Sequence, residues 1–232
     1  SYFEDTLRAG HYENDKTSVE IMIKSSPEVL EDLIAYGVDF QKEEDGSFSY
    51  TREGAHSEKR ILFHKDITGK EITSHLLEQV RKRENVTILE NTCLLDLLCE
   101  DNTCYGAVVW NADRTVSKIC ADYTILATGG IGGLYRHSTN FRHLTGEAIA
   151  LAIKHNIRTK NLDYIQIHPT TLYTKEKSAR SFLISESVRG EGALLYDKNM
   201  QRFVDELLPR DLLSQAIYEQ MEKDGTDFVW ED

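Results

Sequence analysis

Residues 123–133, YTILATGGIGG, decide the fold because they place a short apolar run directly before a glycine-rich turn. The apolar run at 123–127 predicts a buried strand. The glycines after it let backbone N–H groups approach a phosphate or a sugar closely. A tight turn that leaves a sheet is the alternative, since Tyr135 stands where a G-x-G-x-x-G loop would have its last glycine. Both interpretations stay open on this stretch alone.

Further short apolar runs precede this stretch, at residues 86–89, 93–98, 105–110 and 115–119, with a hairpin turn at 111–114. Helical spacing at residues 71–80 comes before them, and a helix over residues 144–155 follows the glycines. This order predicts an α/β (α+β) fold in which a β-meander is inserted into a nucleotide-type domain.

The two ends of the chain are mostly helical. Residues 17–23 predict one helix, and Ser26 and Pro27 are placed as the N-cap and first residue of a second helix that Gly37 ends. Beyond residue 157 we expect a strand at 164–167, a helix at 182–188, a hairpin of residues 193–196 and 201–204, and a helix at 210–223. The change in residue pattern along the chain at this point predicts two domains, residues 1–162 and 163–232.

Composition excludes several classes of function. The 232 residues hold 27 Lys and Arg against 39 Asp and Glu, a net charge of −12 that disfavours nucleic acid and anionic membranes. No apolar run approaches the roughly 20 residues of a membrane-spanning helix. The cysteines lack metal-binding spacing, so no metal site is predicted, and we expect thiols that are buried or inert, in a reducing, cytoplasmic compartment. They are Cys93, Cys99, Cys104 and Cys120.

A few polar residues stand out as candidates for chemistry. Glu186 and Arg189 have the i, i+3 spacing that lets two side chains pair on one helix face. Arg210 follows Pro209 at a predicted helix start, where a guanidinium can grip a carboxylate. His168 precedes a proline, which fixes its backbone in an extended form. These residues predict a site for a dianion but specify no reaction.

The chain resembles the succinate dehydrogenase/fumarate reductase group of flavoproteins and, within it, the L-aspartate oxidases. Matching runs follow the family's order along nearly the whole chain: residues 5–10 (DTLRAG), 52–57 (REGAHS), 60–61 (RI), 66–69 (DITG), 127–130 (ATGG), 145–147 (TGE), 166–170 (QIHPT), 186–192 (ESVRGEG) and 209–211 (PRD). The resemblance implies part of a Rossmann-like FAD-binding domain with a β-meander, followed by part of an α+β capping domain.

The resemblance also implies roles for single residues. Arg210 matches the catalytic arginine that handles the substrate proton, and Glu186 and Arg189 match the relay that feeds it. Glu53 matches the acid that faces the substrate amino group in aspartate oxidases and is lacking in fumarate reductases. Substrate contacts are implied for Glu53, His168, Thr170 and Ser185. Flavin contacts are implied for Thr128, Gly129, Gly130 and Glu147, the last of which is usually Asp in the family.

The implied activity is the FAD-dependent oxidation of L-aspartate to iminoaspartate, in the biosynthesis of quinolinate and NAD, with dioxygen or fumarate as the electron acceptor. Quinolinate synthase is the expected partner because iminoaspartate is unstable. Two alternatives stay open: a fumarate reductase or succinate dehydrogenase flavoprotein acting on fumarate or succinate, and a non-catalytic module that binds dicarboxylates. Since the family's G-x-G-x-x-G loop is expected before residue 1, we expect the chain alone to bind FAD weakly or not at all and to be inactive.

Overall fold

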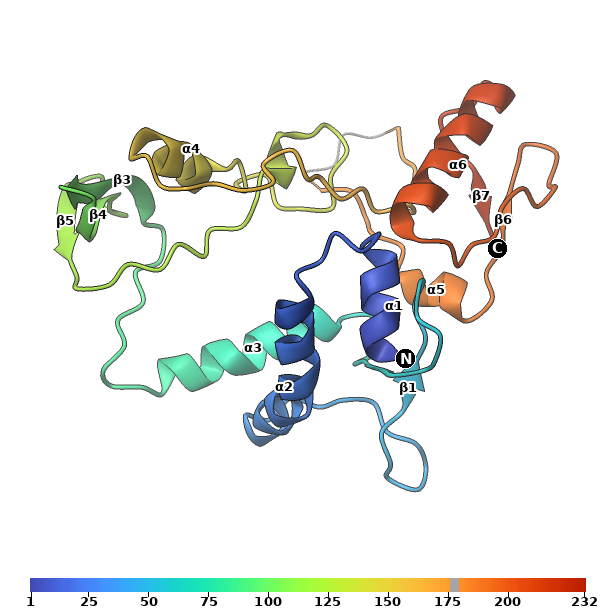
Figure 1. The fold of residues 1–232 in the computed structure, drawn as a ribbon, viewed down its shortest axis with the longest axis horizontal. Coiled ribbons are helices and arrows are strands. Elements are labelled where there is room, and N and C mark those ends of the chain that lie inside the picture. The colour runs from blue at the N-terminus through green and yellow to red at the C-terminus, as the bar shows by residue number, and fades with distance from the viewer. Residues whose placement is uncertain (176–179) are drawn as a thin grey trace. The chain divides into compact units, whose positions relative to one another are not determined.

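The computed structural model describes residues 1–175 and 180–232, which divide into two compact units. Unit 1 comprises Ser1–Glu84, Gln166–Tyr173 and Leu183–Asp232, and unit 2 comprises Asn85–Ile165 and Thr174–Phe182. Figure 1 shows the course of the chain by residue number. The mixture of helices and strands confirms the predicted α+β class, while the domain boundary at residue 162 stays a prediction.

Unit 1 contains five helices in its described residues: α1 (Tyr2–Ala9), α2 (Lys16–Ala35), α3 (Thr68–Arg81), α5 (Glu186–Gly190) and α6 (Arg210–Asp224). The prediction that a helix starts at Pro27 is wrong, because α2 runs straight through it. Proline has no N–H to donate to the carbonyl four residues earlier, that of Ile23. The Ser26 hydroxyl donates to that carbonyl instead, at 2.8 Å, and so satisfies it.

The strands of unit 1 are short, and its core lies at its C-terminal end. β1 (Tyr50–Thr51) pairs with β2 (Ile61–Leu62), and β6 (Leu195–Tyr196) pairs with β7 (Trp230–Glu231), both antiparallel. The predicted hairpin of 193–196 with 201–204 is therefore replaced by the β6–β7 pair, with only a single bridge from Tyr196 to Arg202. The buried core consists of Leu195 from β6 and of Leu213 and Ile217 from α6.

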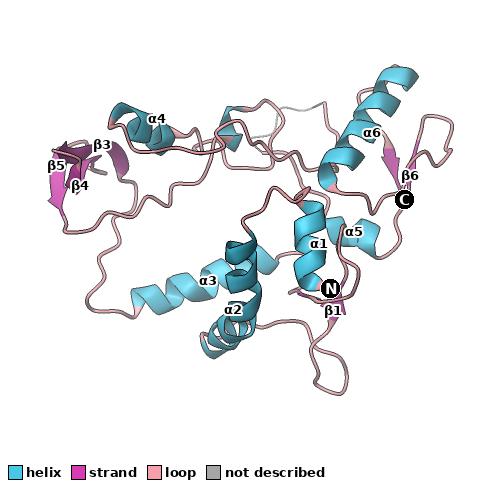
Figure 2. Ribbon diagram, in the orientation of Figure 1, coloured by secondary structure: helices cyan, strands magenta, loops and turns pink. Residues whose placement is uncertain are grey.

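Unit 2 is built around the predicted β-meander. β3 (Cys93–Glu100), β4 (Thr103–Trp110) and β5 (Val116–Cys120) form one antiparallel sheet in chain order (Figure 2). The meander and the turn at 111–114 are confirmed, the turn by the bond from Asn111 N to Thr115 O. The short helices η1 (Gly132–Leu134) and α4 (Glu147–Lys154) follow, and α4 is tied to β3 where Asp96 accepts from Lys154 and His155.

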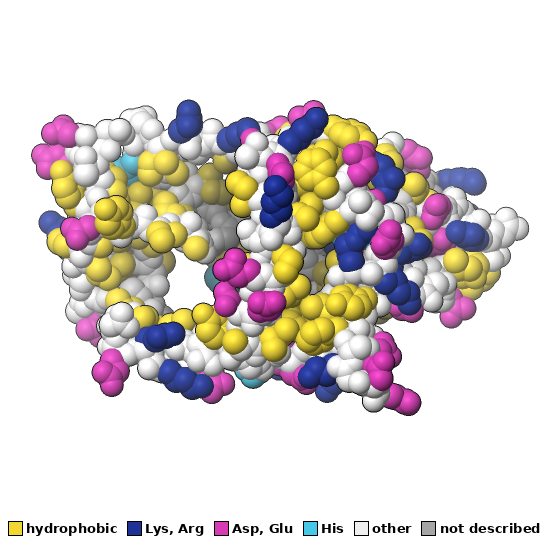
Figure 3. All heavy atoms as spheres, turned by 60° about the horizontal axis from the view of Figure 1, so that its bottom comes forward, with side chains coloured by type: hydrophobic (Ala, Val, Ile, Leu, Met, Phe, Trp, Pro, Cys, Tyr) yellow, Lys and Arg dark blue, Asp and Glu magenta, His cyan; other side chains and the backbone are white. Residues whose placement is uncertain are grey.

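The deciding stretch itself differs from prediction, because residues 123–127 are not a strand. Among the residues that the structure describes, no backbone hydrogen bond involves positions 122–130. A strand exists only when a neighbour pairs with it, and none does here. Tyr123 and Ile125 are accordingly 90% and 89% exposed. Figure 3 shows that hydrophobic side chains reach the surface widely on the face drawn there.

Other local expectations are also corrected. Residues 86–89 and 164–167 form no strand, and the helix expected at 182–188 begins only at Glu186. The cysteines are not buried: Cys93 and Cys120 are exposed, and Cys99 and Cys104 are half-buried. Over the described stretches 1–175 and 180–232, no helix is both long and apolar enough to cross a bilayer.

Candidate active site

Arg210 and Glu186 form the centre of the site in unit 1. Arg210 is the first residue of α6, where Pro209 ends the preceding extended chain, and Glu186 is the first residue of α5. Arg210 donates from Nε to Glu186 Oε2 at 2.7 Å, and its Nη2 lies 2.5 Å from the same oxygen as part of an ion pair. The Glu186 side chain is only 6% exposed, whereas that of Arg210 is 35% exposed. The buried Glu186 carboxylate therefore holds the Arg210 guanidinium in place, and that guanidinium stays partly exposed to solvent.

Arg189 does not pair with Glu186 as the i, i+3 spacing predicts. Its side chain is buried and donates from Nη1 to the Glu206 carbonyl at 2.7 Å, and its Nε lies 4.0 Å from Glu231 Oε1. Burial lowers the pKa of Arg189, although the negative charges of Glu186 and Glu231 act to raise it. Burial also raises the pKa of the Glu231 carboxyl. The predicted pairing of Glu186 with Arg189 is thus wrong, because both side chains are buried and each has another partner.

His168 lies beside this pair on the segment of residues 166–173. Its Nδ1 lies 2.9 Å from the Thr170 carbonyl oxygen, and the Thr170 hydroxyl donates to the Ile184 carbonyl. Burial lowers the pKa of His168, and the nearby positive charge of Arg210 lowers it further, so the neutral imidazole is favoured. Gln166 completes the contact, since its Oε1 accepts from Arg210 Nη1 at 2.8 Å. Sequence reasoning missed Gln166 as a candidate, although it opens the QIHPT run.

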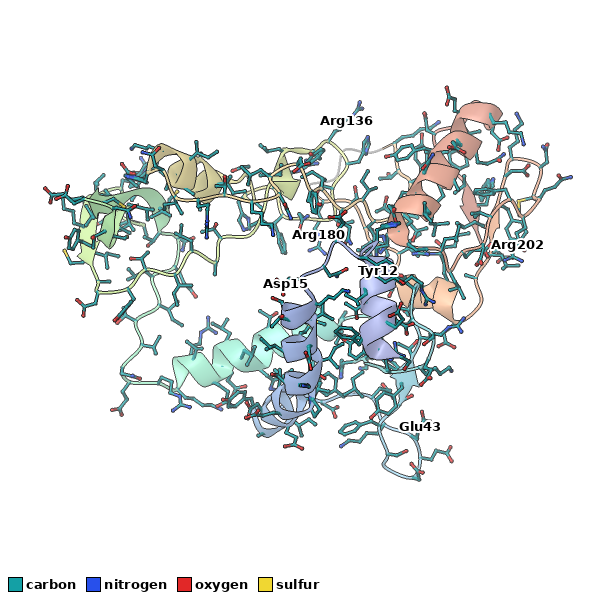
Figure 4. The ribbon with its side chains drawn as sticks, viewed as in Figure 1. Tyr12, Asp15, Glu43, Arg136, Arg180 and Arg202 are labelled. Carbon is teal, nitrogen blue, oxygen red and sulfur yellow. The ribbon has the colours of Figure 1, made fainter. Side chains whose placement is uncertain are left out.

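Glu53 and Ser185 line a common cavity of 570 Å³ in unit 1. Ser185 is the N-cap of α5, and its hydroxyl oxygen lies 2.7 Å from that of Ser187. Further lining residues come from the loop before β1, which carries Glu43 (Figure 4), from β1 itself, from the start of α3 and from α5. Lys59 and Lys65 also line this cavity. It therefore offers both a carboxylate and cations to a small charged ligand.

A close approach at Gly54 joins the cavity to the Arg210–Glu186 pair. A Cβ added at Gly54 would lie 2.3 Å from Glu186 Oε1, so the backbone of this loop passes close to that carboxylate. The residue before Gly54 is Glu53 and the residue before Glu186 is Ser185. Four of the predicted site residues, namely Glu53, Ser185, Glu186 and Arg210, are thereby brought together by one contact.

Asp5 anchors the loop that carries Glu53, and sequence reasoning missed it. The Asp5 carboxylate accepts from Ser57 N at 2.9 Å, from Ser57 Oγ at 2.6 Å and from Arg60 Nη1 at 2.6 Å. The hydrogen bonds from Ser57, with the charge of Arg60, hold its pKa well below its usual range. The only signal in the sequence was the position of Asp5 in the first matching run, because neither spacing nor composition links residues so far apart.

The predicted flavin contacts lie in unit 2. Thr128 and Gly129 line a second cavity, of 280 Å³, together with residues of α4 such as Ala148. A Cβ at Gly130 would meet no atom within 4 Å, so the backbone there is open to a close ligand. Glu147 begins α4, and its carboxylate accepts from the Thr145 hydroxyl, which lowers its pKa. Within the described residues, no group of three His, Cys, Asp or Glu side chains could hold a metal ion.

Comparison with known proteins gives consistent matches. The family model of the FAD binding domain matches residues 1–232. L-aspartate oxidases of Clostridium acetobutylicum and Clostridium perfringens are each 49% identical over 100% of this chain, and the chain covers 53% and 52% of their lengths. The chain therefore spans about half the length of the curated relatives that it matches.

Solved structures of related flavoproteins share the fold. A quinol fumarate reductase from E. coli matches with a TM-score of 0.87 and 26% identity, over 96% of this chain and 40% of the other. The apo Sdh1 complex of Mycobacterium smegmatis matches with a TM-score of 0.77 and 29% identity, over 100% and 41%.

FAD is the cofactor that these matches imply, and residues 128–130 of unit 2 leave space for part of it to approach the backbone. FAD needs a backbone that a ring or sugar can approach without meeting a side chain, and the open space at Gly130 provides this. The backbone N–H groups of residues 128–130 have no partner among the described residues and are free to donate. The backbone of residues 128–130 thus fits a close approach of this cofactor, and the flavin contacts of Thr128, Gly129, Gly130 and Glu147 stay predictions.

Proposed function

The chain belongs to the FAD binding domain family, and from this premise we propose that it is the central part of an L-aspartate oxidase. The whole enzyme would oxidise L-aspartate to iminoaspartate. The observation that carries the proposal is the contact at Gly54, which sets Glu53 and Ser185, on one cavity, next to the Arg210–Glu186 pair. FAD, when bound, would accept the two electrons that leave the substrate, with dioxygen or fumarate as the final acceptor.

The chain's own residues would position the substrate by its charges. Glu53 would hold the ammonium group, and the Ser185 hydroxyl, with His168, would bind a carboxylate. Thr170, whose hydroxyl donates to the Ile184 carbonyl, would position His168 through its own carbonyl oxygen. The charge of Arg210 would stabilise negative charge that develops on the substrate during the reaction. A guanidinium is a poor base because its pKa is above about 12, so Arg210 would deliver a proton more readily than it would remove one.

Glu186 would keep Arg210 oriented through its hydrogen bond and the ion pair. Arg189 lies behind Glu186 in the buried interior and would supply positive charge there. We also propose quinolinate synthase as the consumer of the unstable product, and the cytoplasmic location stays a prediction from the cysteines.

A fumarate reductase or succinate dehydrogenase flavoprotein is the second candidate, and the TM-score of 0.87 to a quinol fumarate reductase favours it. Glu53 separates the two candidates, because fumarate and succinate carry no ammonium group for it to hold. The test is Glu53→Gln in the full-length protein that contains this sequence. We expect the KM for L-aspartate to rise roughly 30-fold, the loss of a charged hydrogen bond of about 2 kcal/mol, while fumarate reduction changes less than about 2-fold.

Glu58→Gln is the matched control, because Glu58 is an exposed glutamate on the same loop as Glu53 and does not line the cavity. It should leave both reactions unchanged. Equal loss of aspartate oxidation and fumarate reduction in Glu53→Gln would contradict the role of Glu53. The third candidate, a dicarboxylate-binding module without catalysis, is tested by calorimetric titration of the chain with FAD and with succinate. Tight binding of succinate in the absence of FAD would favour it.

A further inference from the structure

Cys99 and Cys104 face each other across the β3–β4 hairpin. The strand register pairs Cys99 with Cys104 and Glu100 with Thr103. Asp101 and Asn102 form the turn, with positive φ angles of 47° and 59°. In a hairpin with such a two-residue turn, the residues that flank the turn are the hydrogen-bonded pair, so the next pair is not hydrogen-bonded. Cys99 and Cys104 occupy that next position.

This position suits a disulfide. Cα atoms of a non-hydrogen-bonded pair lie about 4.5 Å apart, within the range of about 4.4–6.8 Å that a disulfide spans. Beyond the cysteines the ladder is interrupted, because Leu97 pairs with Ala107 and two residues, Tyr105 and Gly106, stand opposite Leu98. This bulge lets the strands adjust at the cysteine pair without disturbing the register of the rest of the meander.

The two cysteines affect each other electrostatically, and both are partly accessible. Burial and the neighbouring Cys104 side chain raise the pKa of Cys99, the Cys104 thiol donates to the Gly106 carbonyl at 3.5 Å, and both residues are half-buried. The other two cysteines have different register partners: Cys93 pairs with Trp110, and Cys120 pairs with Gly106. Only one of the possible cysteine pairs is therefore set opposite by the sheet.

We propose that Cys99 and Cys104 are a site of reversible disulfide formation, by exchange with a low-molecular-weight disulfide such as oxidised glutathione. The Cys104 thiolate attacks one sulfur of that disulfide, forms a mixed disulfide and releases the first thiolate. The Cys99 thiolate then attacks Cys104 Sγ and releases the second. The two protons pass to the released thiolates, so the cysteine pair loses two electrons and the small disulfide gains them.

The surroundings of the two thiols favour this order of attack. A hydrogen bond from the Thr124 hydroxyl lowers the pKa of Cys104, whereas burial raises the pKa of Cys99. The thiolate is the nucleophile, so Cys104 is the group that attacks first and Cys99 the group that resolves the mixed disulfide.

The experiment uses Cys93→Ser/Cys120→Ser, which keeps only the facing pair, and Cys99→Ser/Cys104→Ser as the matched control. Both chains are equilibrated in glutathione redox buffers, alkylated and cut with a glutamate-specific protease. Cleavage after Glu100 separates Cys99 from Cys104, so a disulfide alone can join the two peptides. We expect joined peptides in the first variant and none in the control, and two of the four thiols lost in the wild-type chain.

Repeating the equilibration in urea shows whether the fold promotes the bond. We expect the oxidation equilibrium constant to be at least ~10-fold greater in the folded chain, a shift of about 30 mV. An equal or smaller constant in the folded chain, or recovery of only mixed disulfides with glutathione, would overturn the proposal. Thr124→Val should slow the first exchange step several-fold, and an unchanged rate would refute the assigned order of attack.

Discussion

Replacing Gly54 by alanine tests whether the loop at residues 52–54 confines the Glu186 carboxylate. The new Cβ would lie 2.3 Å from Glu186 Oε1, a separation shorter than the 3.0 Å below which Cβ contacts are essentially never seen. The φ angle of Gly54 is not positive, so alanine itself adds no backbone strain. The carboxylate must therefore move, or the loop must lift away from α5.

The cost of that movement follows from what holds Glu186. Its side chain is 6% exposed, receives a hydrogen bond from Arg210 Nε at 2.7 Å and lies 2.5 Å from Arg210 Nη2 in an ion pair. Overpacking costs about 1–3 kcal/mol, and a weakened charged hydrogen bond costs about 1.5–3 kcal/mol. We expect Gly54→Ala to lower the free energy of unfolding by about 3 kcal/mol, a large part of the roughly 5–15 kcal/mol of a typical domain.

Urea unfolding followed by circular dichroism measures this change. Gly69→Ala is the matched control, because Gly69 lies in α3 and a Cβ there would meet nothing within 4 Å. The control should be neutral or stabilising by up to about 1 kcal/mol. In the Glu186→Asp background, where the carboxylate is withdrawn, Gly54→Ala should cost at least about 1.5 kcal/mol less. A Gly54→Ala chain within about 0.5 kcal/mol of wild type would refute the confinement.

Two further predictions concern buried or bridging aspartates. Asp5→Asn should destabilise the chain by about 2 kcal/mol at pH 7. Folding lowers the pKa of Asp5, so its contribution to stability is present above the unfolded pKa of about 4 and is lost as the pH falls below that value. Urea unfolding should therefore show the stabilities of wild type and variant converging below about pH 4. A constant difference between them would contradict this. Asp96→Asn should speed amide hydrogen exchange in α4, because the Asp96 carboxylate accepts from Lys154 and His155 of that region. The control is Asp113→Asn, in the turn before β5, which should leave exchange in α4 unchanged. Unchanged exchange in both variants would show that this contact does not hold α4.

The meander was predictable because its signals are local. Each strand pairs with the next one along the chain through a short turn, so the alternation of residues and the turn between 111 and 114 suffice. Helix α6 was likewise predictable from its own periodicity. The segment 123–127 was not, because a strand depends on a pairing partner that its own residues do not specify. The same holds for Pro27, where the Ser26 hydroxyl rescues a helix that proline would otherwise end.

The sequence predicted which residues belong to the site better than it predicted which of them contact each other. Spacing marked Glu186, Arg189 and Arg210 as candidates, but it paired the first two, whereas Glu186 binds Arg210, 24 residues further on. A spacing rule describes neighbours on one helix and cannot select a partner on another. Asp5 and Gln166 were missed for the same reason, because their roles exist only after distant segments have met.

The division of the chain has a consequence for protein engineering. Residues 166–173, with His168 and Gln166, belong to unit 1, yet both their flanks belong to unit 2. A single cut thus cannot separate the two modules. Excising residues 85–182 and splicing the ends would discard this eight-residue insert, so a minimal version of unit 1 would have to carry it back on two newly designed connectors.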